Sequence, residues 1–131
     1  MKQTTIRLTS GADLKESIEK IATEQGIEAG VILSLVGSLS MCKLRMAGAK
    51  EMREWNTELE IVSGMGTVSK NGSHVHISVS DVSGATFGGH LVPGCTVRTT
   101  VECVIGIFDD VVYTREPDTV TGFKELVVKK K

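Results

Sequence analysis

Residues 73–92, SHVHISVSDVSGATFGGHLV, are the stretch that decides how this chain folds. Between Ser73 and Ser80, apolar and polar residues alternate strictly, which is the period of a β-strand with one buried face. After the letters DVSG the alternation resumes and continues to Leu91. Gly84 in that linker suits the left-handed position of a three-residue hairpin loop. The stretch therefore predicts a β-hairpin.

The register of this hairpin decides whether the three histidines of the chain share one face. His74 and His76 are two residues apart, so they point to the same side of their strand. A three-residue loop pairs Asp81 with Ala85, and counting back along both strands puts His90 directly opposite His76. Directly opposite residues have Cβ atoms about 5 Å apart. The sequence therefore predicts three imidazoles on one patch of sheet, whereas a two-residue loop would separate them.

Three histidines with a fourth position left open are the ligand set of catalytic-type zinc sites. The spacing alone leaves two interpretations open, because a single histidine on a strand is usually an ordinary polar surface residue. The expected cofactor is a divalent transition metal, Zn²⁺ before copper, nickel, iron or cobalt, held by His74, His76 and His90. Ser78 and Thr86 fall on the same predicted face and are candidates to orient the rings.

The composition of the chain limits its class. Its 131 residues suffice for one domain, spanning residues 1–131, with a sizeable core. A net charge of −1 provides no global basic field for nucleic acid. No apolar run approaches the roughly 18 residues of a membrane helix, and the first residues lack the apolar core of a signal peptide. Three cysteines without a CxxC motif predict buried, reduced thiols and a cytoplasmic location.

One amphipathic helix is predicted near the start of the chain. Apolar residues recur at helical spacing from Leu14 to Ala22. Ser10 followed by Asp13 resembles a capping box, and Gly26 is a natural stop. The pattern predicts a helix over residues 12–25.

The rest of the chain is typical of β-strands. We expect a strand over 30–36, a break at Gly37, and a second strand over 39–47, followed by a polar loop over 48–56. The other expected strands cover residues 4–8, 59–69, 73–80, 85–91, 97–108, 111–115 and 123–128. One helix with short antiparallel connections predicts an α+β fold. We expect a mainly antiparallel, strongly curled sheet of about seven or eight strands packed with one main α-helix.

Four segments carry a family resemblance. In chain order they are GSLSMCKLR, LEIVSGMGTVS, HVHISVSDVSGATFGGHLVPGCTV and TTVECV. Together they resemble the plant- and prokaryote-conserved (PPC) domain. The resemblance implies an α+β fold, a homotrimer in prokaryotic members, and a metal site at the positions of His74, His76 and His90. In plants the domain belongs to nuclear AT-hook proteins, so the resemblance also implies DNA, or a DNA-binding protein, as a partner.

Two features of the sequence weaken the implied link to DNA. The chain contains no Arg-Gly-Arg-Pro core of an AT-hook. A segment that plant members use for partner contacts matches residues 58–62, ELEIV, where Glu58 replaces an arginine. Lys43, Arg45, Lys50 and Arg53 are close in sequence, but acidic residues at positions 51 and 54 predict an ordinary solvated surface there.

Two classes of function therefore stay open. The first is a metal-binding PPC module associated with DNA. The second is a metal-dependent hydrolase, because a zinc site with an open position can lower the pKa of bound water to about 7. A hydrolase also needs a general acid or base, for which Glu102 and Asp81 are candidates. Arg45 or Arg98 would bind a substrate carboxylate or phosphate.

Overall fold

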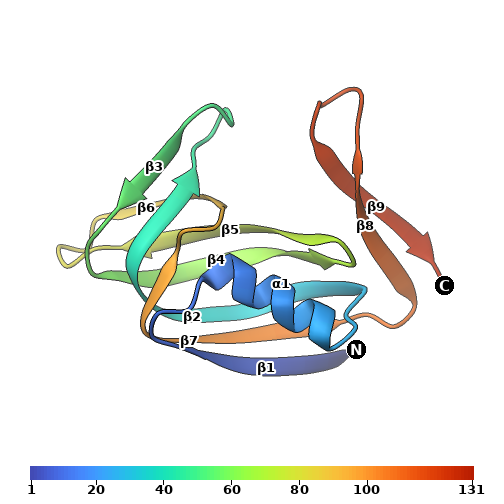
Figure 1. Cartoon of the computed structure of the whole chain (residues 1–131), viewed down its shortest axis with the longest axis horizontal. Helices are drawn as coiled ribbons and strands as arrows, with labels where there is room; N and C mark the ends of the chain where they lie inside the picture. Colours follow the sequence, from blue (N-terminus) through green and yellow to red (C-terminus); the bar gives the residue numbers. More distant parts are fainter.

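The computed structural model describes residues 1–131 and consists of one helix and nine β-strands (Figure 1). In chain order the elements are β1 (Lys2–Thr9), α1 (Leu14–Glu24), β2 (Ala29–Arg45), β3 (Met52–Trp55), β4 (Leu59–Ser69), β5 (Gly72–Ser80), β6 (Thr86–Leu91), β7 (Thr96–Ile107), β8 (Val111–Pro117) and β9 (Lys124–Lys130). Seven strands form one sheet, and β8 and β9 form a separate two-stranded sheet. No helix has the length and apolar character that crossing a membrane requires.

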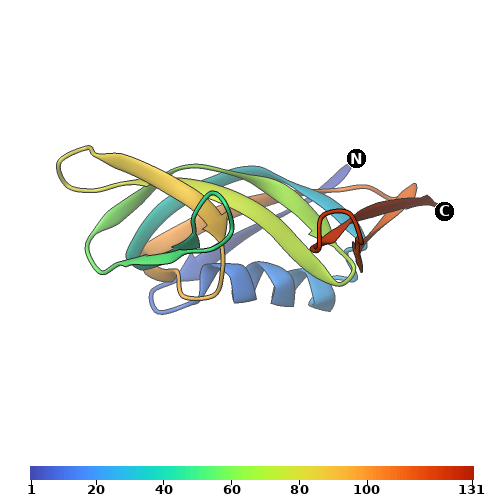
Figure 2. The same ribbon diagram turned by 90° about the horizontal axis from the view of Figure 1, so that it is seen from above.

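The main sheet is antiparallel and curls until it meets itself. Its strand order is β1-β7-β2-β4-β5-β6, and β2 also pairs with β6. The start of β2 pairs with β4, whereas its end pairs with β6 through Leu44 and Arg45. Strands β2, β4, β5 and β6 therefore make a closed, barrel-like ring, with α1 along one side and the β8–β9 hairpin at one end (Figure 2). The predicted α+β class and the strongly curled antiparallel sheet are confirmed.

Strand β2 does not break where the sequence analysis placed a break. It continues for 17 residues, and its pairing with β7 shifts register on both sides of Gly37. A Cβ atom at Gly37 would collide with the carbonyl of Thr100 and with Val101, so only glycine allows β7 to pass this closely. The glycine therefore marks a bulge rather than a strand end, and bulges of this kind let a long strand bend into a ring.

The predicted loop over residues 48–56 is partly wrong as well. Residues 52–55 form β3, which pairs with the end of β2. Trp55 at its end stacks on Phe87 of β6, with ring centroids 4.3 Å apart. The other residues of β3 are exposed on both sides. The strand therefore lacks the alternation of apolar and polar residues on which the sequence analysis depended.

Helix α1 begins later than predicted, and its cap is a different residue. Asp13 is the N-cap: its Oδ1 accepts a hydrogen bond of 3.0 Å from the amide of Glu16. Its Oδ2 accepts a second bond, 2.7 Å long, from the amide of Gly94. The carbonyl of Ala12 accepts a bond from the amide of Val97, and Asp13, in extended backbone, forms a bridge with Thr96. The helix cannot start at residue 12, because that backbone already belongs to the edge of the sheet.

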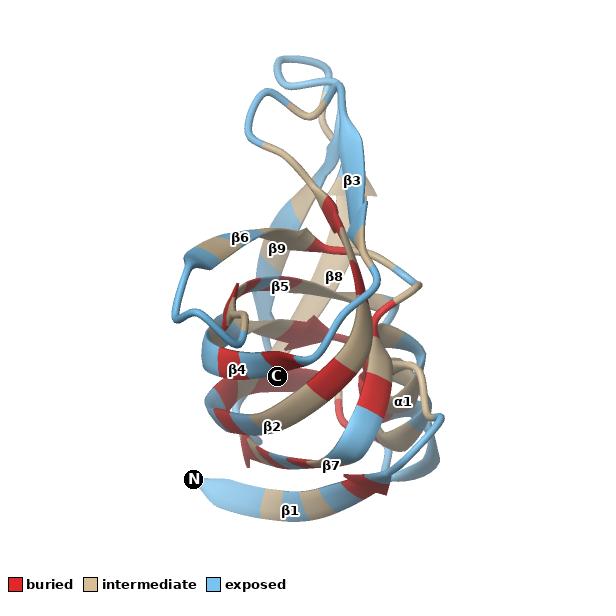
Figure 3. Ribbon diagram, turned by 90° about the vertical axis from the view of Figure 1, so that its left-hand side faces the viewer, coloured by how far each residue is buried: buried red, intermediate tan, exposed pale blue.

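The core lies between α1 and the concave face of the curled sheet. Leu14, Ile18 and Ala22 line one stripe of the helix and are buried there. Buried residues, drawn red in Figure 3, recur along β2, β4, β5 and β7. The cysteines Cys42 and Cys95 belong to this core with Cys103, and all three are unbridged, as predicted. Burial raises the pKa of Cys103 to about 11.

The cap gives a direct test of the helix start. Asp13→Ala removes both the bond that caps α1 and the bond that ties it to Gly94, so we expect the free energy of unfolding to fall by about 2 kcal/mol. Ser10→Ala is the matched control: Ser10 makes no side-chain hydrogen bond, and its loss should cost less than about 0.5 kcal/mol. Urea denaturation followed by circular dichroism measures both. Equal losses in the two variants would contradict this assignment of the cap.

Candidate metal centre

The hairpin has the register that the sequence predicts. The amide of Asp81 donates to the carbonyl of Ala85, and the three-residue loop contains Gly84 at φ 84°. His76 of β5 consequently lies directly opposite His90 of β6. The carboxylate of Asp81 accepts bonds from the amide and hydroxyl of Ser83 and from the amide of Ala85. These bonds explain why the loop keeps three residues, and they lower the pKa of Asp81.

The register places four residues in one row across four neighbouring strands. Met65 of β4 pairs with His76, His76 pairs with His90, and His90 pairs with Arg45 of β2. Directly paired residues share a face of the sheet. His74, two residues before His76, joins the same face. This is the outer face of the ring, because Val75 and Ile77, which alternate with the histidines, are buried in the core.

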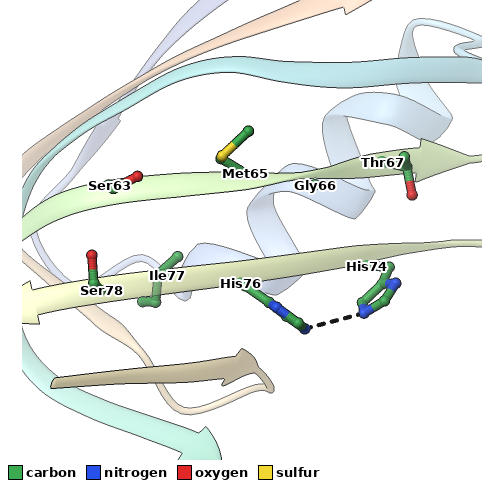
Figure 4. Close-up of a pocket in the computed structure, with 8 residues that line it drawn as sticks. All are labelled: Ser63, Met65, Gly66, Thr67, His74, His76, Ile77 and Ser78. Carbon is green, nitrogen blue, oxygen red and sulfur yellow. Dashed lines mark hydrogen bonds between the residues drawn. The ribbon is translucent and has the colours of Figure 1, made fainter.

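The three imidazoles converge as a ligand set must. One ring nitrogen from each histidine can be chosen so that all three atoms lie within 4.8 Å of one another. The Nε2 atoms of His74 and His76 are 3.3 Å apart, and Figure 4 shows their rings pointing toward each other. A tetrahedral zinc ion with Zn–N bonds of about 2.1 Å separates its ligand atoms by about 3.4 Å. The spacing of this pair therefore fits two ligands of one ion.

His90 offers a lone pair that nothing in the protein uses. Its Nδ1 atom is buried and has no hydrogen-bond partner. Burial, the guanidinium of Arg45 and the two other histidines lower the pKa of His90 to about 4. Burial and the nearby Arg115 likewise lower the pKa of His74. Both rings are therefore neutral at pH 7, which is the form that binds a metal, and the residues present fit a divalent transition metal.

A half-buried ion pair anchors β5 just before the histidines. Lys15 and Glu19, one turn apart on α1, are 2.9 Å apart. Glu19 Oε1 also accepts bonds of 3.0 and 2.8 Å from the amide and hydroxyl of Ser73, and Lys15 donates to the carbonyl of Ser73. Burial works against ionisation of Glu19, but the bonds from Lys15 and Ser73 prevail and lower its pKa. The helix therefore holds the backbone that carries His74.

The histidines border three open spaces, a groove and two pockets, and one of these pockets, of about 330 Å³, lies between His76, His90 and the segment that joins β2 to β3. A shallow groove of about 460 Å³ runs along β4 and β5, between Met65 and the pair His74 and His76 (Figure 4). A second pocket, of about 320 Å³, lies between the histidines and the β8–β9 hairpin. Its walls combine residues of the sheet with residues of the hairpin, including Arg45, His74, His90, Arg115, Phe123 and Glu125.

Of the residues that the sequence suggested for acid–base catalysis or substrate binding, one lies beside the histidines and the others lie elsewhere. Arg45 lies beside His90 and lines the second pocket. Glu102 does not approach: it lies on β7, and strands β2 and β4 separate β7 from β5. Asp81 is held in the hairpin loop, and Arg98 pairs with Glu58 at 3.4 Å, on the rim of a different pocket.

The candidates for orienting the rings also differ from expectation. The hydroxyl of Thr86 donates to the carbonyl of Gly84 and not to a histidine. Ser78 lines the groove beside His76 without bonding it. The pocket residues that sequence reasoning missed are Arg115, Phe123 and Glu125. They come from a hairpin outside the main sheet, and no local pattern indicates where such a hairpin will lie.

Known proteins resemble this chain over nearly its whole length. It is 42% identical over 125 residues to the bifunctional protein GlmU of Synechococcus sp. (strain JA-3-3Ab), a match that covers 95% of this chain and 20% of that protein. The chain thus spans about a fifth of the length of this relative. A hypothetical protein from Salmonella cholerae-suis superimposes with a TM-score of 0.94 at 33% identity, covering 99% of this chain and 94% of the other.

Two further solved structures carry functional descriptions. The metal-containing protein AF0104 from Archaeoglobus fulgidus has a TM-score of 0.79 at 28% identity, covering 97% of this chain and 94% of the other. A supposed DNA-binding protein from Bacteroides thetaiotaomicron has a TM-score of 0.86 at 18% identity, covering 95% of this chain and 91% of the other. At that identity the second likeness establishes the fold alone.

A family model defines the group to which the chain is related. The model of the Plants and Prokaryotes Conserved (PCC) domain, the family named from the four segments above, matches residues 1–109. The match spans β1 to β7 and all three histidines, and the β8–β9 hairpin follows it. The chain belongs to the Plants and Prokaryotes Conserved domain family.

Proposed function

We propose that this protein is a metal-binding member of its family that holds a divalent transition metal, Zn²⁺ first, through His74, His76 and His90. The observation that carries the proposal is the convergence of one nitrogen from each ring within 4.8 Å, with one pair spaced at 3.3 Å. The description of the Archaeoglobus fulgidus relative as metal-containing supports it. A fourth position would face the open pocket, so the ion would remain accessible to a small molecule.

Metal content tests the proposal directly. Protein purified without a metal-affinity tag should contain about one zinc per chain by mass spectrometry. His76→Ala should lose most of this zinc, because His76 lies opposite His90 and beside His74, and the triple alanine variant should lose all of it. Ser78→Ala, on the same face of the same strand, is the control and should keep the metal. Full zinc occupancy in His76→Ala would rule out the proposed site.

We also propose that copies of the chain assemble as a homotrimer through the outer face of β2 and β4. Four apolar side chains are exposed there: Leu33, Val36, Val62 and Met65, with exposed fractions of 49, 50, 58 and 71%. The neighbouring pairs Val31–Thr67 and Gly37–Ile61 bring the two strands together along this surface. Apolar surface gathered on one face is typical of protein–protein interfaces, and Met65 makes it continuous with the histidines.

Light scattering tests the assembly. Val62→Asp puts a charge into the proposed interface, and we expect the molar mass to fall from that of a trimer to that of a monomer. Val82→Asp is the control, because Val82 is equally apolar but lies in the β5–β6 loop. A wild-type monomer, or a trimer that tolerates Val62→Asp as well as Val82→Asp, would refute the proposed interface.

Metal-dependent hydrolysis is a second candidate function, favoured by one observation. Glu125 lines the same pocket as His74 and His90, and its negative charge opposes, without reversing, the lowering of the pKa of His74. A carboxylate therefore stands near the place where a general base is needed. Arg45, on the same pocket, would bind the negative group of a substrate. Glu102, the carboxylate suggested by the sequence, is too far round the sheet for this role.

The hydrolase proposal is tested by two variants that should differ in their effects on kcat and on zinc content. If it cleaves a test ester such as p-nitrophenyl phosphate, Glu125→Gln should lower kcat while leaving the zinc content unchanged. His76→Ala should lower both. Glu116→Gln, on the same hairpin and outside the pocket, is the control for Glu125. Cleavage that survives intact in Glu125→Gln would exclude Glu125 as the base.

Association with DNA stays a prediction from the family resemblance. The charges of the chain do not favour it, and two of the four cations near β3 are paired with carboxylates. Lys43 pairs with Glu54 at 3.6 Å, and Arg53 pairs with Glu51 at 3.4 Å. With a net charge of −1, the chain as a whole presents no positive field toward a phosphate backbone.

A further inference from the structure

The guanidinium of Arg45 is an unused recognition group beside the histidines. Arg45 is half-buried, yet its side chain makes no hydrogen bond to the protein and no ion pair. Its Cζ atom lies 5.5 Å from the centre of the Phe123 ring, so stacking on that ring holds the side chain in place. An arginine carries five N–H donors, and a half-buried one normally finds acceptors for them. The donors of Arg45 are available to a ligand.

The β8–β9 hairpin forms the opposite wall of the pocket, and the turn between β4 and β5 holds this hairpin in place. Asn71, in the turn between β4 and β5, donates to the carbonyl of Arg115 and accepts from its amide, at 2.9 and 2.7 Å. The amide of Lys70 donates to the carbonyl of Tyr113, at 2.9 Å. Within the hairpin, Arg115 Nη2 donates to the carbonyl of Lys124, at 2.8 Å. Because of these bonds, Phe123 and Arg115 face the histidines from a defined position.

The charges that line the pocket favour an anion. Arg45, Arg115 and Lys124 supply three cations, and none of them forms an ion pair with an acidic residue. Two carboxylates also line the pocket. Glu19 is already neutralised by Lys15 at 2.9 Å, which leaves Glu125 as the single uncompensated negative charge. Three cations against one carboxylate leave the pocket positive.

We propose that this pocket binds a small organic anion, a carboxylate or a phosphate monoester, whose charged end is held by the guanidinium of Arg45. An oxyanion matches the planar fork of arginine, which binds two oxygens at once. Phe123 supplies apolar surface for the organic part of the ligand, and 320 Å³ limits it to a small molecule. The inference deepens the proposed metal function and rests on it in one respect: the anion would bind beside the ion that the histidines hold.

The C-terminal hairpin would then select the ligand. Residues 1–109 match the family model, and they supply the histidines and Arg45. The residues that face them, Phe123, Arg115 and Lys124, lie beyond that match. The metal ligands therefore belong to the family domain, whereas the opposite wall of the pocket comes from a segment outside it.

Calorimetric titration of the zinc-loaded protein tests the proposal, with benzoate, phenyl phosphate and inorganic phosphate as probes. We expect benzoate or phenyl phosphate to bind, and the comparison of these two identifies the anionic group. Arg45→Gln should raise the Kd of the bound probe about tenfold or more. The control is Arg98→Gln, since Arg98 is paired with Glu58 at another pocket, and it should change the Kd less than twofold. Inorganic phosphate should bind more weakly than phenyl phosphate, because it leaves Phe123 uncovered.

Measuring zinc in the same samples separates this inference from the proposed metal function. Unchanged zinc in Arg45→Gln together with weaker anion binding supports the pocket. If zinc-loaded wild type binds none of the probes, or if Arg45→Gln binds them as well as wild type, the anion pocket is overturned while the metal site stands. If wild type takes up no zinc, the metal proposal fails, and titration of the metal-free protein decides the pocket alone. A tenfold loss in Arg45→Gln would then support it, and no binding would overturn it.

Discussion

The site depends on one constraint, the three-residue loop that joins β5 and β6. Bonds from Ser83 and Ala85 to the carboxylate of Asp81 stabilise this loop and pair Asp81 with Ala85. A change of one residue in its length would send every side chain of β6 to the opposite face. His90 would then enter the core, and His74 and His76 would remain on the surface without it. The convergence of the three imidazoles is thus a consequence of loop length.

The bend of β2 adds a fourth residue, Arg45, to the three histidines of the hairpin. Because register shifts at Gly37 let β2 curve, its first residues pair with β4 and its last residues pair with β6. The ring closes, and Arg45 is brought beside His90. The β8–β9 hairpin then covers this end of the row, held by Asn71 and the turn between β4 and β5. The three histidines, a free guanidinium and an aromatic ring meet although they come from three strands, β2, β5 and β6, and from the loop between β8 and β9.

Much of this arrangement could be predicted, because period-two alternation and loop length are local properties. Strand β4 and the hairpin of β5 and β6 came close to their true bounds. The prediction failed where local pattern and tertiary contact disagree. Gly37 has the appearance of a strand end, but the close approach of β7 makes it a bulge. Ser10 has the appearance of a cap, but backbone bonds tie the residues after it to residues 95–97, so that Asp13 takes that role.

The sequence by itself determined the class of the fold, the register of the hairpin and the histidine trio, since each follows from spacing along a continuous stretch of chain. Only the tertiary structure decided which charged residues accompany the trio. It placed Arg45 and Glu125 beside the histidines and left Glu102 on β7, with two strands between it and β5. The physical reason is that sheet closure and the docking of β8 and β9 depend on backbone bonds between distant segments. Such bonds form between groups that every residue carries, and the side-chain sequence does not record them.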